Sequence, residues 1–441
     1  MKRFAHMCFC ASLVAALAPV ALSAQTITFA QPHAVYSGAP SESAVTLYAY
    51  GNYLGKSINH LIVRYPSSQN GQTEYSYEFL VGDGSGDFPE YSQLTLPTES
   101  AALTADINGD GYPDLITLLP ACIAAPCLNT ADPEQGNVTF MVNNGNESFS
   151  NVGSMLLPVG LSGLQGVVGD FNKDGKPDVA IIAYATGGTF VTARLIVLLN
   201  QGDESFSMKS YLLPSALSSG AAVSNIVTGD FNGDGMPDLA VAFASPTTGD
   251  NAWLLTFAGD GKGNFAPAKK SYIFDSNFVA NGHPLQAADL NGDGRTDLVI
   301  NLQAKSDAGQ PRIASLLSKG SADFYWASAV SIAAPGATDI VVADFNGDGK
   351  PDLAYIGETE YPQPIIEVGG VYPGNGKGGF STPHIPLFPS TTSGGEVVQG
   401  SPTATLTAMP FHSGLLPSLL VSLASPTFNA NYFYELINTS K

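Results

Sequence analysis

A nine-residue acidic motif that occurs five times restricts the possible folds of this chain more than any other feature. Its clearest copy is Asp344-Phe-Asn-Gly-Asp-Gly-Lys-Pro-Asp352. The other copies begin at Asp106, Asp170, Asp230 and Asp289, and all five keep Asp at positions one, five and nine, Asn at position three and Gly at position six. A motif repeated in this way indicates a fold assembled from similar units.

The motif has the composition of a loop that binds a hard cation. It offers only oxygen ligands, from the side chains at positions one, three, five and nine and the carbonyl at position seven, and this set suits Ca²⁺ better than a transition metal. The glycine at position six can adopt a positive φ at little cost where such a loop turns. We therefore expect five calcium loops with these ligands: Asp106, Asn108, Asp110, Tyr112 and Asp114; Asp170, Asn172, Asp174, Lys176 and Asp178; Asp230, Asn232, Asp234, Met236 and Asp238; Asp289, Asn291, Asp293, Arg295 and Asp297; Asp344, Asn346, Asp348, Lys350 and Asp352.

An EF-hand is the first alternative, because it shares the opening D-x-N-x-D-G. It requires a glutamate at position twelve, where this chain has Thr117, Ile181, Val241, Ile300 and Tyr355. A short apolar run follows each ninth-position Asp, and such runs indicate buried strands. The motif is therefore expected to connect two strands.

A second signature, Gly-x-x-x-Phe, follows each motif after 31 to 39 residues. The same spacing from Gly84 back to Asn52 identifies a degenerate first loop at Asn52–His60, with Lys56 at position five. The resemblance of 406–408 to 103–105 places a degenerate seventh loop at 409–418. Neither degenerate loop is expected to bind calcium.

Seven units of about 60 residues, each with four strands, account for residues 25–441 and predict an all-β, seven-bladed β-propeller. In the unit that contains Asp289, the expected strands are 285–288, 298–302, 313–317 and 325–332. The last unit lacks a fourth strand, which we expect Thr26–Phe29 to supply, so that the ring closes. A linear stack of units is the alternative. The 47 Gly, 30 Pro and 13% charged residues favour an all-β fold.

These loops and hairpins resemble the FG-GAP/VCBS repeats, including the seven-bladed propeller of integrin α subunits. The resemblance covers essentially all of residues 25–441. It implies that calcium occupies the loop between the first two strands of a blade, and it suggests a role in cell adhesion. The second metal-bearing domain that integrins use for ligand capture has no room in this chain.

The N-terminal segment predicts export. Lys2 and Arg3 precede an apolar stretch that ends in small residues, so residues 1–24 are expected to be a signal peptide, with a short membrane anchor as the alternative. The chain is then secreted, periplasmic or on the cell surface, with no membrane span after cleavage. In such a compartment Cys122 and Cys127 are expected to form a disulfide, although two free thiols are the alternative.

The sequence favours binding over catalysis. It contains no H-E-x-x-H, G-x-S-x-G or phosphate-loop motif, and His33, His60, His283, His384 and His412 lack ligand spacing. A net charge of −20 argues against nucleic-acid binding.

We expect a monomeric binding or adhesion module for an extracellular protein or glycan, with about five structural Ca²⁺ ions. Insertions at 120–136 and 357–364 are candidate recognition loops, with ordinary surface variation as the alternative. The alternative function is a carbohydrate-active enzyme, either a polysaccharide lyase or a hydrolase.

Overall fold

The computed structural model describes residues 27, 33–36, 46–69, 72–96, 101–121, 135–161, 163–184, 193–213, 222–244, 253–272, 278–304, 312–321, 323–331, 336–358, 367–382, 385–387, 405–410, 416–425, 430–436 and 438–440. Within these residues, strands form seven four-stranded sheets, which are numbered here 1 to 7. In the same residues, no helix has the length and apolar character to cross a membrane.

Sheet 1 contains β2 (Thr46–Gly51), β3 (His60–Gln69), β4 (Gln72–Val81) and β5 (Glu90–Leu94). Sheet 2 contains β6 (Ala101–Ala105), β7 (Asp114–Leu119), β8 (Asn137–Asn143) and β9 (Phe149–Leu156). Sheet 3 contains β10 (Gly163–Gly169), β11 (Asp178–Tyr184), β12 (Arg194–Asn200) and β13 (Phe206–Leu212). Sheet 4 contains β14 (Ala222–Gly229), β15 (Asp238–Ala244), β16 (Trp253–Phe257) and β17 (Lys269–Tyr272). Sheet 5 contains β18 (Phe278–Ala288), β19 (Asp297–Ala304), β20 (Arg312–Ser318) and β21 (Phe324–Ser331). Sheet 6 contains β22 (Gly336–Ala343), β23 (Asp352–Glu358), β24 (Glu367–Tyr372) and β25 (Ile385–Pro386). Sheet 7 contains β1 (His33–Tyr36), β26 (Thr405–Met409), β27 (Ser418–Ser425) and β28 (Ala430–Leu436).

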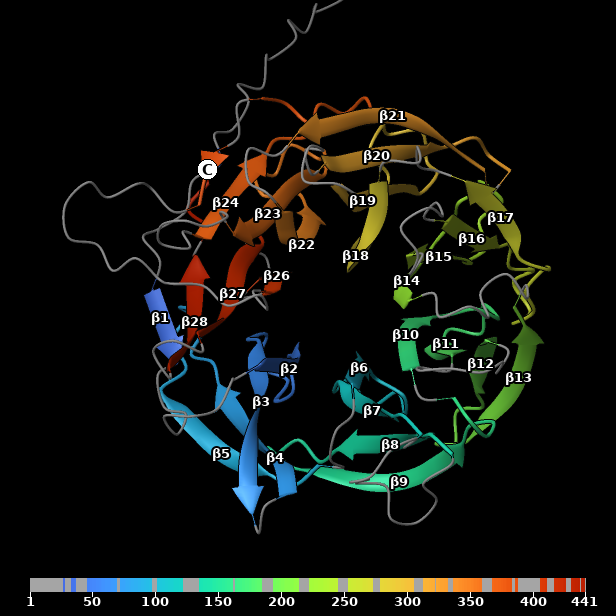
Figure 1. Cartoon of the computed structure of the whole chain (residues 1–441). Helices are drawn as coiled ribbons and strands as arrows, with labels where there is room; N and C mark the ends of the chain where they lie inside the picture. Colours follow the sequence, from blue (N-terminus) through green and yellow to red (C-terminus); the bar gives the residue numbers. More distant parts are fainter. Residues whose placement is uncertain are drawn as a thin grey trace, which may run out of the picture.

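The sheets are arranged radially about a common centre (Figure 1). In sheets 1 to 6 the strands follow chain order, with the first strand nearest the centre and the later strands toward the perimeter. This arrangement defines an all-β propeller. The four strands predicted in the unit of Asp289 are confirmed as β18 to β21. β18 begins seven residues before the predicted start, β19 and β20 are slightly longer than predicted, and β21 lies one residue earlier.

Every loop motif connects the first two strands of its sheet, as predicted. The residue before position one pairs with the residue at position nine, as in Ala105↔Asp114. The degenerate first loop has the same register, Gly51↔His60. In sheet 7 the pair is Met409↔Ser418, so the seventh loop begins one residue later than the sequence comparison placed it. Met409 belongs to the strand because its side chain is fully buried.

The N-terminal strand of sheet 7 also differs from the prediction. β1 pairs antiparallel with β28 through His33↔Glu435 and Ala34↔Tyr434, whereas the expected strand was Thr26–Phe29. Of that expected range only Ile27 is described, and it lies outside the strands. The side chain of Ile27 is buried in a cluster with Leu406 and Val421, so this residue contributes to the hydrophobic core and is not part of the strand that pairs with β28.

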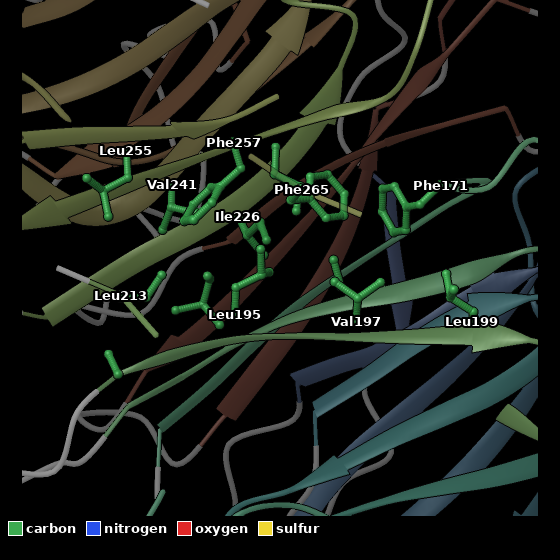
Figure 2. Packing of buried hydrophobic residues seen from close by; sticks show 14 residues of the cluster. Phe171, Leu195, Val197, Leu199, Leu213, Ile226, Val241, Leu255, Phe257 and Phe265 are labelled. Atoms are coloured by element: carbon green, nitrogen blue, oxygen red, sulfur yellow. The ribbon is translucent and has the colours of Figure 1, made fainter. Parts of the chain in front are cut away.

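Apolar side chains fill the space between neighbouring sheets. The middle strands β11 and β12 are buried on both faces, which explains why their sequences are continuous apolar runs. Figure 2 shows the cluster between sheets 3 and 4, where Phe171 and Phe265 meet edge to face with ring centroids 5.5 Å apart. Because each sheet packs against the next in this way, the loops at the sheet ends are held in fixed relative positions.

Polar side chains, one half-buried and one buried, join the inner strands of neighbouring sheets at two equivalent places. Asn225 of sheet 4 accepts from the N–H of Leu285 at 2.7 Å and donates to its carbonyl at 2.9 Å. In sheet 6 the corresponding residue is Asp339, which accepts from the N–H of Leu406 in sheet 7 at 2.8 Å. Asp339 is 9% exposed, and burial raises its pKa to about 7.

Asp339 should make stability depend on pH. Folding raises its pKa from 3.8, so its favourable contribution is complete below about pH 4 and is lost as the pH rises through about 7. We expect Asp339→Asn to increase the unfolding free energy at pH 8 by roughly 1–3 kcal/mol and to have little effect at pH 4. Urea unfolding at both pH values measures this, and the reciprocal Asn225→Asp variant should acquire the same pH dependence. Equal effects at both pH values would contradict it.

Candidate cation-binding loops

Each loop motif folds around its first aspartate, and the loops of sheets 2 to 6 are called here loops 2 to 6. In loop 2 the carboxylate of Asp106 accepts hydrogen bonds from the N–H groups of Gly109, Asp110 and Gly111, at 2.7 to 3.1 Å. Both glycines have positive φ, 77° and 89°, which explains why these positions hold Gly. The bond to position six is present in loops 3 to 6 as well, through Asp170, Asp230, Asp289 and Asp344.

Positions three and five form two further turns that are the same in all five loops. The amide oxygen at position three accepts from the N–H of position five, and the carboxylate at position five accepts from the N–H of position seven. Tyr112, Lys176, Met236, Arg295 and Lys350 are the donors at position seven. The five loops therefore share one turn geometry, in which side-chain oxygens from positions one, three and five lie on the same short turn.

Three position-seven side chains place their own positive charge on the position-five carboxylate. The distances are 3.2 Å for Lys176–Asp174, 2.6 Å for Arg295–Asp293 and 2.9 Å for Lys350–Asp348. Such partly exposed ion pairs contribute only about 0–1 kcal/mol. A divalent cation would displace them at little cost.

The ninth-position aspartates occupy a different environment, since all five are fully buried. Asp114 accepts from the N–H of Ile107 at position two and from the N–H of Asn143 at the end of the third strand, both at 2.8 Å. The same two bonds recur in loops 3 to 6 through Asp178, Asp238, Asp297 and Asp352. Burial raises the pKa of these carboxyls, to about 6 for Asp114 and about 7 for Asp352.

The donor chemistry of the loops fits a hard cation. Each loop supplies three carboxylates and one amide within nine residues and no thiol or imidazole, which is a Ca²⁺-type set. Within the described ranges, however, no three acidic, histidine or cysteine side chains converge as a ready metal cage. The carboxylates at positions one and five accept hydrogen bonds from loop N–H groups, and each carboxylate has further lone pairs with which it could coordinate a cation.

Hydrogen bonds between sheets, which the sequence did not reveal, hold each loop to its neighbour. We call them inter-sheet bonds. The acceptor is always the position-two carbonyl, as where the side-chain N–H of Asn200 in sheet 3 donates to Ile107 at 2.8 Å. Asn143, Ser318 and Asn438 make the corresponding contacts to Tyr53, Phe231 and Phe345.

Sheets 4 and 6 make the inter-sheet bond with glycines. There the backbone N–H groups of Gly263 and Gly378 donate to the carbonyls of Phe171 and Leu290. Gly259 stands where sheet 3 has Asn200, and a Cβ on it would lie 2.1 Å from the carbonyl oxygen of Pro237. The sequence does carry a signal for these donors. In sheets 2 to 6, the residue two positions before the glycine of each Gly-x-x-x-Phe signature, called here the hairpin glycine, is Asn or Ser where a side chain donates and Gly where the backbone donates.

Asn200→Asp should therefore weaken the junction of sheets 2 and 3. The substitution keeps the bonds to Asp178 and Gly202 but replaces the donor to Ile107 by a carboxylate oxygen. We expect a loss of roughly 2–4 kcal/mol in unfolding free energy, measured by urea denaturation. Asn151→Asp makes the same chemical change at an exposed residue of sheet 2, where the new carboxylate can still accept from the N–H of Gly153, and it should cost under about 0.5 kcal/mol. Similar losses for both variants would argue against the inter-sheet bond.

The two degenerate loops keep part of this framework without the carboxylates. In sheet 7, Ser418 replaces the ninth aspartate and accepts from the N–H of Asn438 at 3.0 Å. In sheet 1 the same position holds His60, which is 1% exposed and whose pKa is lowered by burial. The side chain of Asn59 donates to the carbonyl of Pro410 in sheet 7.

A cavity of about 400 Å³ lies between loops 3 and 4. Asp170 and Lys173 line it from one side, and Asp230, Gly235 and Met236 from the other. The cavity shows that these two loops face each other across a common space.

Several predicted sites fall outside the described residues. These include Cys122 and Cys127, most of both insertions, and the segment 1–24. The insertions do connect second to third strands, since β7 ends at Leu119 and β24 begins at Glu367.

Comparison with known proteins gives the same assignment as the geometry. The FG-GAP-like repeat family matches residues 127–181 and 230–300, which contain loops 3, 4 and 5. Phosphatidylinositol-glycan-specific phospholipase D of Rattus norvegicus is 30% identical over 156 residues, which are 32% of this chain and 18% of that protein. Integrin alpha-PS5 of Drosophila melanogaster is 32% identical over 146 residues, 30% of this chain and 14% of that protein. Each match thus spans less than a fifth of the relative. The Dos1 propeller aligns over 93% of this chain and 95% of its own, at 11% identity and a TM-score of 0.46.

The radial sheets and their repeated acidic loops define a β-propeller with loops of cation-binding composition at the first turn of five repeats, in sheets 2 to 6. More particularly, the chain is an FG-GAP-like repeat β-propeller, distantly related to integrin α subunits and to phosphatidylinositol-glycan-specific phospholipase D.

Proposed function

We propose that this protein is a secreted, calcium-stabilised, seven-bladed propeller that acts as a binding or adhesion module for a protein or glycan. The observation that carries the calcium proposal is the fivefold repetition of one loop, with three carboxylates and one amide in the same places each time. Like charges held so close repel each other, and a bound divalent cation would neutralise them. The ligands would be the side chains at positions one, three, five and nine and the carbonyl at position seven.

Closure of the ring is the second part of the proposal. The pairing of β1 with β28 supports it, because the two ends of the chain then share one sheet. The contact from Asn59 in sheet 1 to Pro410 in sheet 7 supports it as well. A closed ring leaves no long strand edge exposed to other chains.

A candidate ligand surface lies on sheet 1, which has no acidic loop. The guanidinium carbon of Arg64 lies 4.8 Å from the ring centroid of Tyr75, and both side chains are partly exposed. Tyr48 and Tyr77 are buried in the core behind them, with the ring centroid of Tyr48 5.8 Å from the same guanidinium carbon, so Arg64 and Tyr75 are the groups that a ligand could reach. An aromatic face beside a charged donor suits recognition of a glycan or of a protein.

The alternative, a carbohydrate-active enzyme, would need an acid and a phenol open to substrate. On the other face of sheet 1, Glu78 accepts from the hydroxyl of Tyr65 at 3.0 Å. Both side chains are buried, so this pair is packed and not presented to a substrate. The arrangement therefore favours binding over catalysis.

Two measurements test the proposal. Elemental analysis after dialysis into calcium buffer should find about five ions, and Asp348→Ala should lose one; an unchanged count would refute the assignment of loop 6.

On a glycan array, retention without product would support a binding module, whereas released unsaturated sugars would identify a lyase. Tyr75→Ala should weaken retention, and Tyr325→Ala, which removes an exposed aromatic from sheet 5, is the matched control.

A further inference from the structure

Loops 3, 4 and 5 contact one another directly, in addition to the inter-sheet bonds. The ammonium of Lys173 in loop 3 donates to the carbonyl of Gly235 in loop 4 at 3.0 Å. Loop 5 reaches loop 4 through its backbone, where the N–H of Thr296 donates to the carbonyl of Asp230 at 2.8 Å. Arg295 also packs on loop 4, since a Cβ on Gly233 would lie 3.1 Å from the Cγ of Arg295.

The backbone of Lys173 is strained, and this strain is tied to the contact. Lys173 occupies position four with φ of 59°, where loops 2, 4, 5 and 6 have glycine. A side chain in this left-handed region is unfavourable by roughly 1 kcal/mol. The hydrogen bond from the Lys173 ammonium to loop 4 requires this side chain, so the contact is made at the cost of a strained backbone.

Loops 2 and 6 have a different environment. A Cβ on Gly109 of loop 2 or on Gly292 of loop 5 would meet no atom within 4 Å, so position four is open on the sides that face loops 3 and 6. Loop 2 instead packs on the degenerate first loop, where a Cβ on Gly55 would lie 2.8 Å from the ring of Tyr112. Among the five acidic loops, the tight loop-to-loop contacts in the described residues thus link loop 3 with loop 4 and loop 4 with loop 5.

We propose that loops 3, 4 and 5 bind their cations as one coupled unit, whereas loops 2 and 6 bind independently. This inference rests on the proposed calcium function. Ordering of loop 4 by a cation fixes Gly235 and Asp230, which are the acceptors for Lys173 of loop 3 and Thr296 of loop 5. Each neighbour then loses less conformational freedom when its own cation binds, which is positive cooperativity.

Repulsion between bound cations acts in the opposite direction. At about 0.15 M salt the screening length is about 8 Å, so repulsion between ions in separate exposed loops is weak. One hydrogen bond gained on ordering is expected to raise a neighbouring loop's affinity about fivefold. The ordering effect therefore dominates at this ionic strength.

The test compares two matched substitutions at position five by calcium titration calorimetry and by counting bound ions at fixed free calcium. Asp234→Ala in loop 4 should remove its own ion and weaken two others about fivefold each. Asp110→Ala in loop 2 should remove its own ion and leave the other four affinities unchanged. Equal, single-ion losses in both variants would overturn the coupling.

A second variant protects the test from folding defects. Lys173→Gly removes the ammonium but keeps the backbone conformation, so five ions should still bind, with a lower Hill coefficient for the coupled phase. Lys377→Ala removes one positive charge from the hairpin of sheet 6 and should leave the titration as in the wild type. An unchanged Hill coefficient in Lys173→Gly would overturn the role of Lys173. Five ions bound independently in the wild type would overturn the coupling alone, whereas no bound ion would refute the calcium function and the coupling together.

Discussion

Removal of divalent cations by EDTA should lower the melting temperature of this protein by roughly 10–15 °C. Five sites at a hundredfold excess of calcium over Kd contribute about 2.7 kcal/mol each to folding. A chain of this length unfolds with an entropy of about 2.1 cal/mol/K per residue, which converts that total into the stated shift. Differential scanning calorimetry with and without calcium measures it.

Calcium added after EDTA should restore the original melting temperature. An equal ionic strength of NaCl should not, because monovalent ions screen the carboxylates without coordinating them. A melting temperature unaffected by chelation, together with an elemental analysis free of divalent ions, would rule out calcium as the stabilising ligand.

Substitution of a ninth-position aspartate should destabilise the protein even when no metal is present. Asp178→Ala leaves the buried N–H groups of Phe171 and Asn200 without their acceptor, and we expect a loss of roughly 3–5 kcal/mol in EDTA by urea denaturation. Asp174→Ala, in the same loop at the exposed fifth position, should change stability in EDTA by under about 1 kcal/mol. Its cost should appear only in calcium, as the loss of one site.

This pair of substitutions separates two roles that the motif combines. Position five would serve the cation, whereas position nine joins the loop to the third strand of its own sheet. If Asp178→Ala and Asp174→Ala left the unfolding free energy in EDTA equally unchanged, the buried hydrogen bonds of position nine would not contribute to stability.

The acidic motif and the Gly-x-x-x-Phe signature together were enough to predict the main features of the fold. The motif correctly placed each loop between two strands, as the Ala105↔Asp114 ladder shows, and the spacing between the two signatures correctly aligned the degenerate loop that ends at His60. Motif positions carry this information because a turn of fixed length fixes the register of the strands beside it. The seventh loop lacks the motif residues, so nothing in the sequence fixed its first residue, and the prediction placed that residue one position too early.

Features that depend on partners distant in the sequence could not be predicted. The position of Asn200, two residues before a hairpin glycine, marks it as a candidate donor, but the sequence does not identify its acceptor Ile107, because the two residues are 93 positions apart and meet only when sheets pack. The sequence alone gives no sign that Asp339 differs from a surface carboxylate, because its burial against sheet 7 depends on the packing of the two sheets. The short β1 strand likewise has no strong pattern of its own, and its place follows from the exposed edge of β28.

The acceptor of every inter-sheet bond is a main-chain carbonyl, and this has a consequence for how such proteins diverge. A donor of the next sheet finds the same oxygen whatever side chains the accepting turn carries, as Asn143 does at Tyr53 in the first repeat, whose loop lacks the acidic motif. Single repeats can therefore lose the acidic residues at positions one and five while neighbouring sheets stay joined. If calcium binds as proposed, the requirement for it could be lost one repeat at a time while the propeller fold is kept.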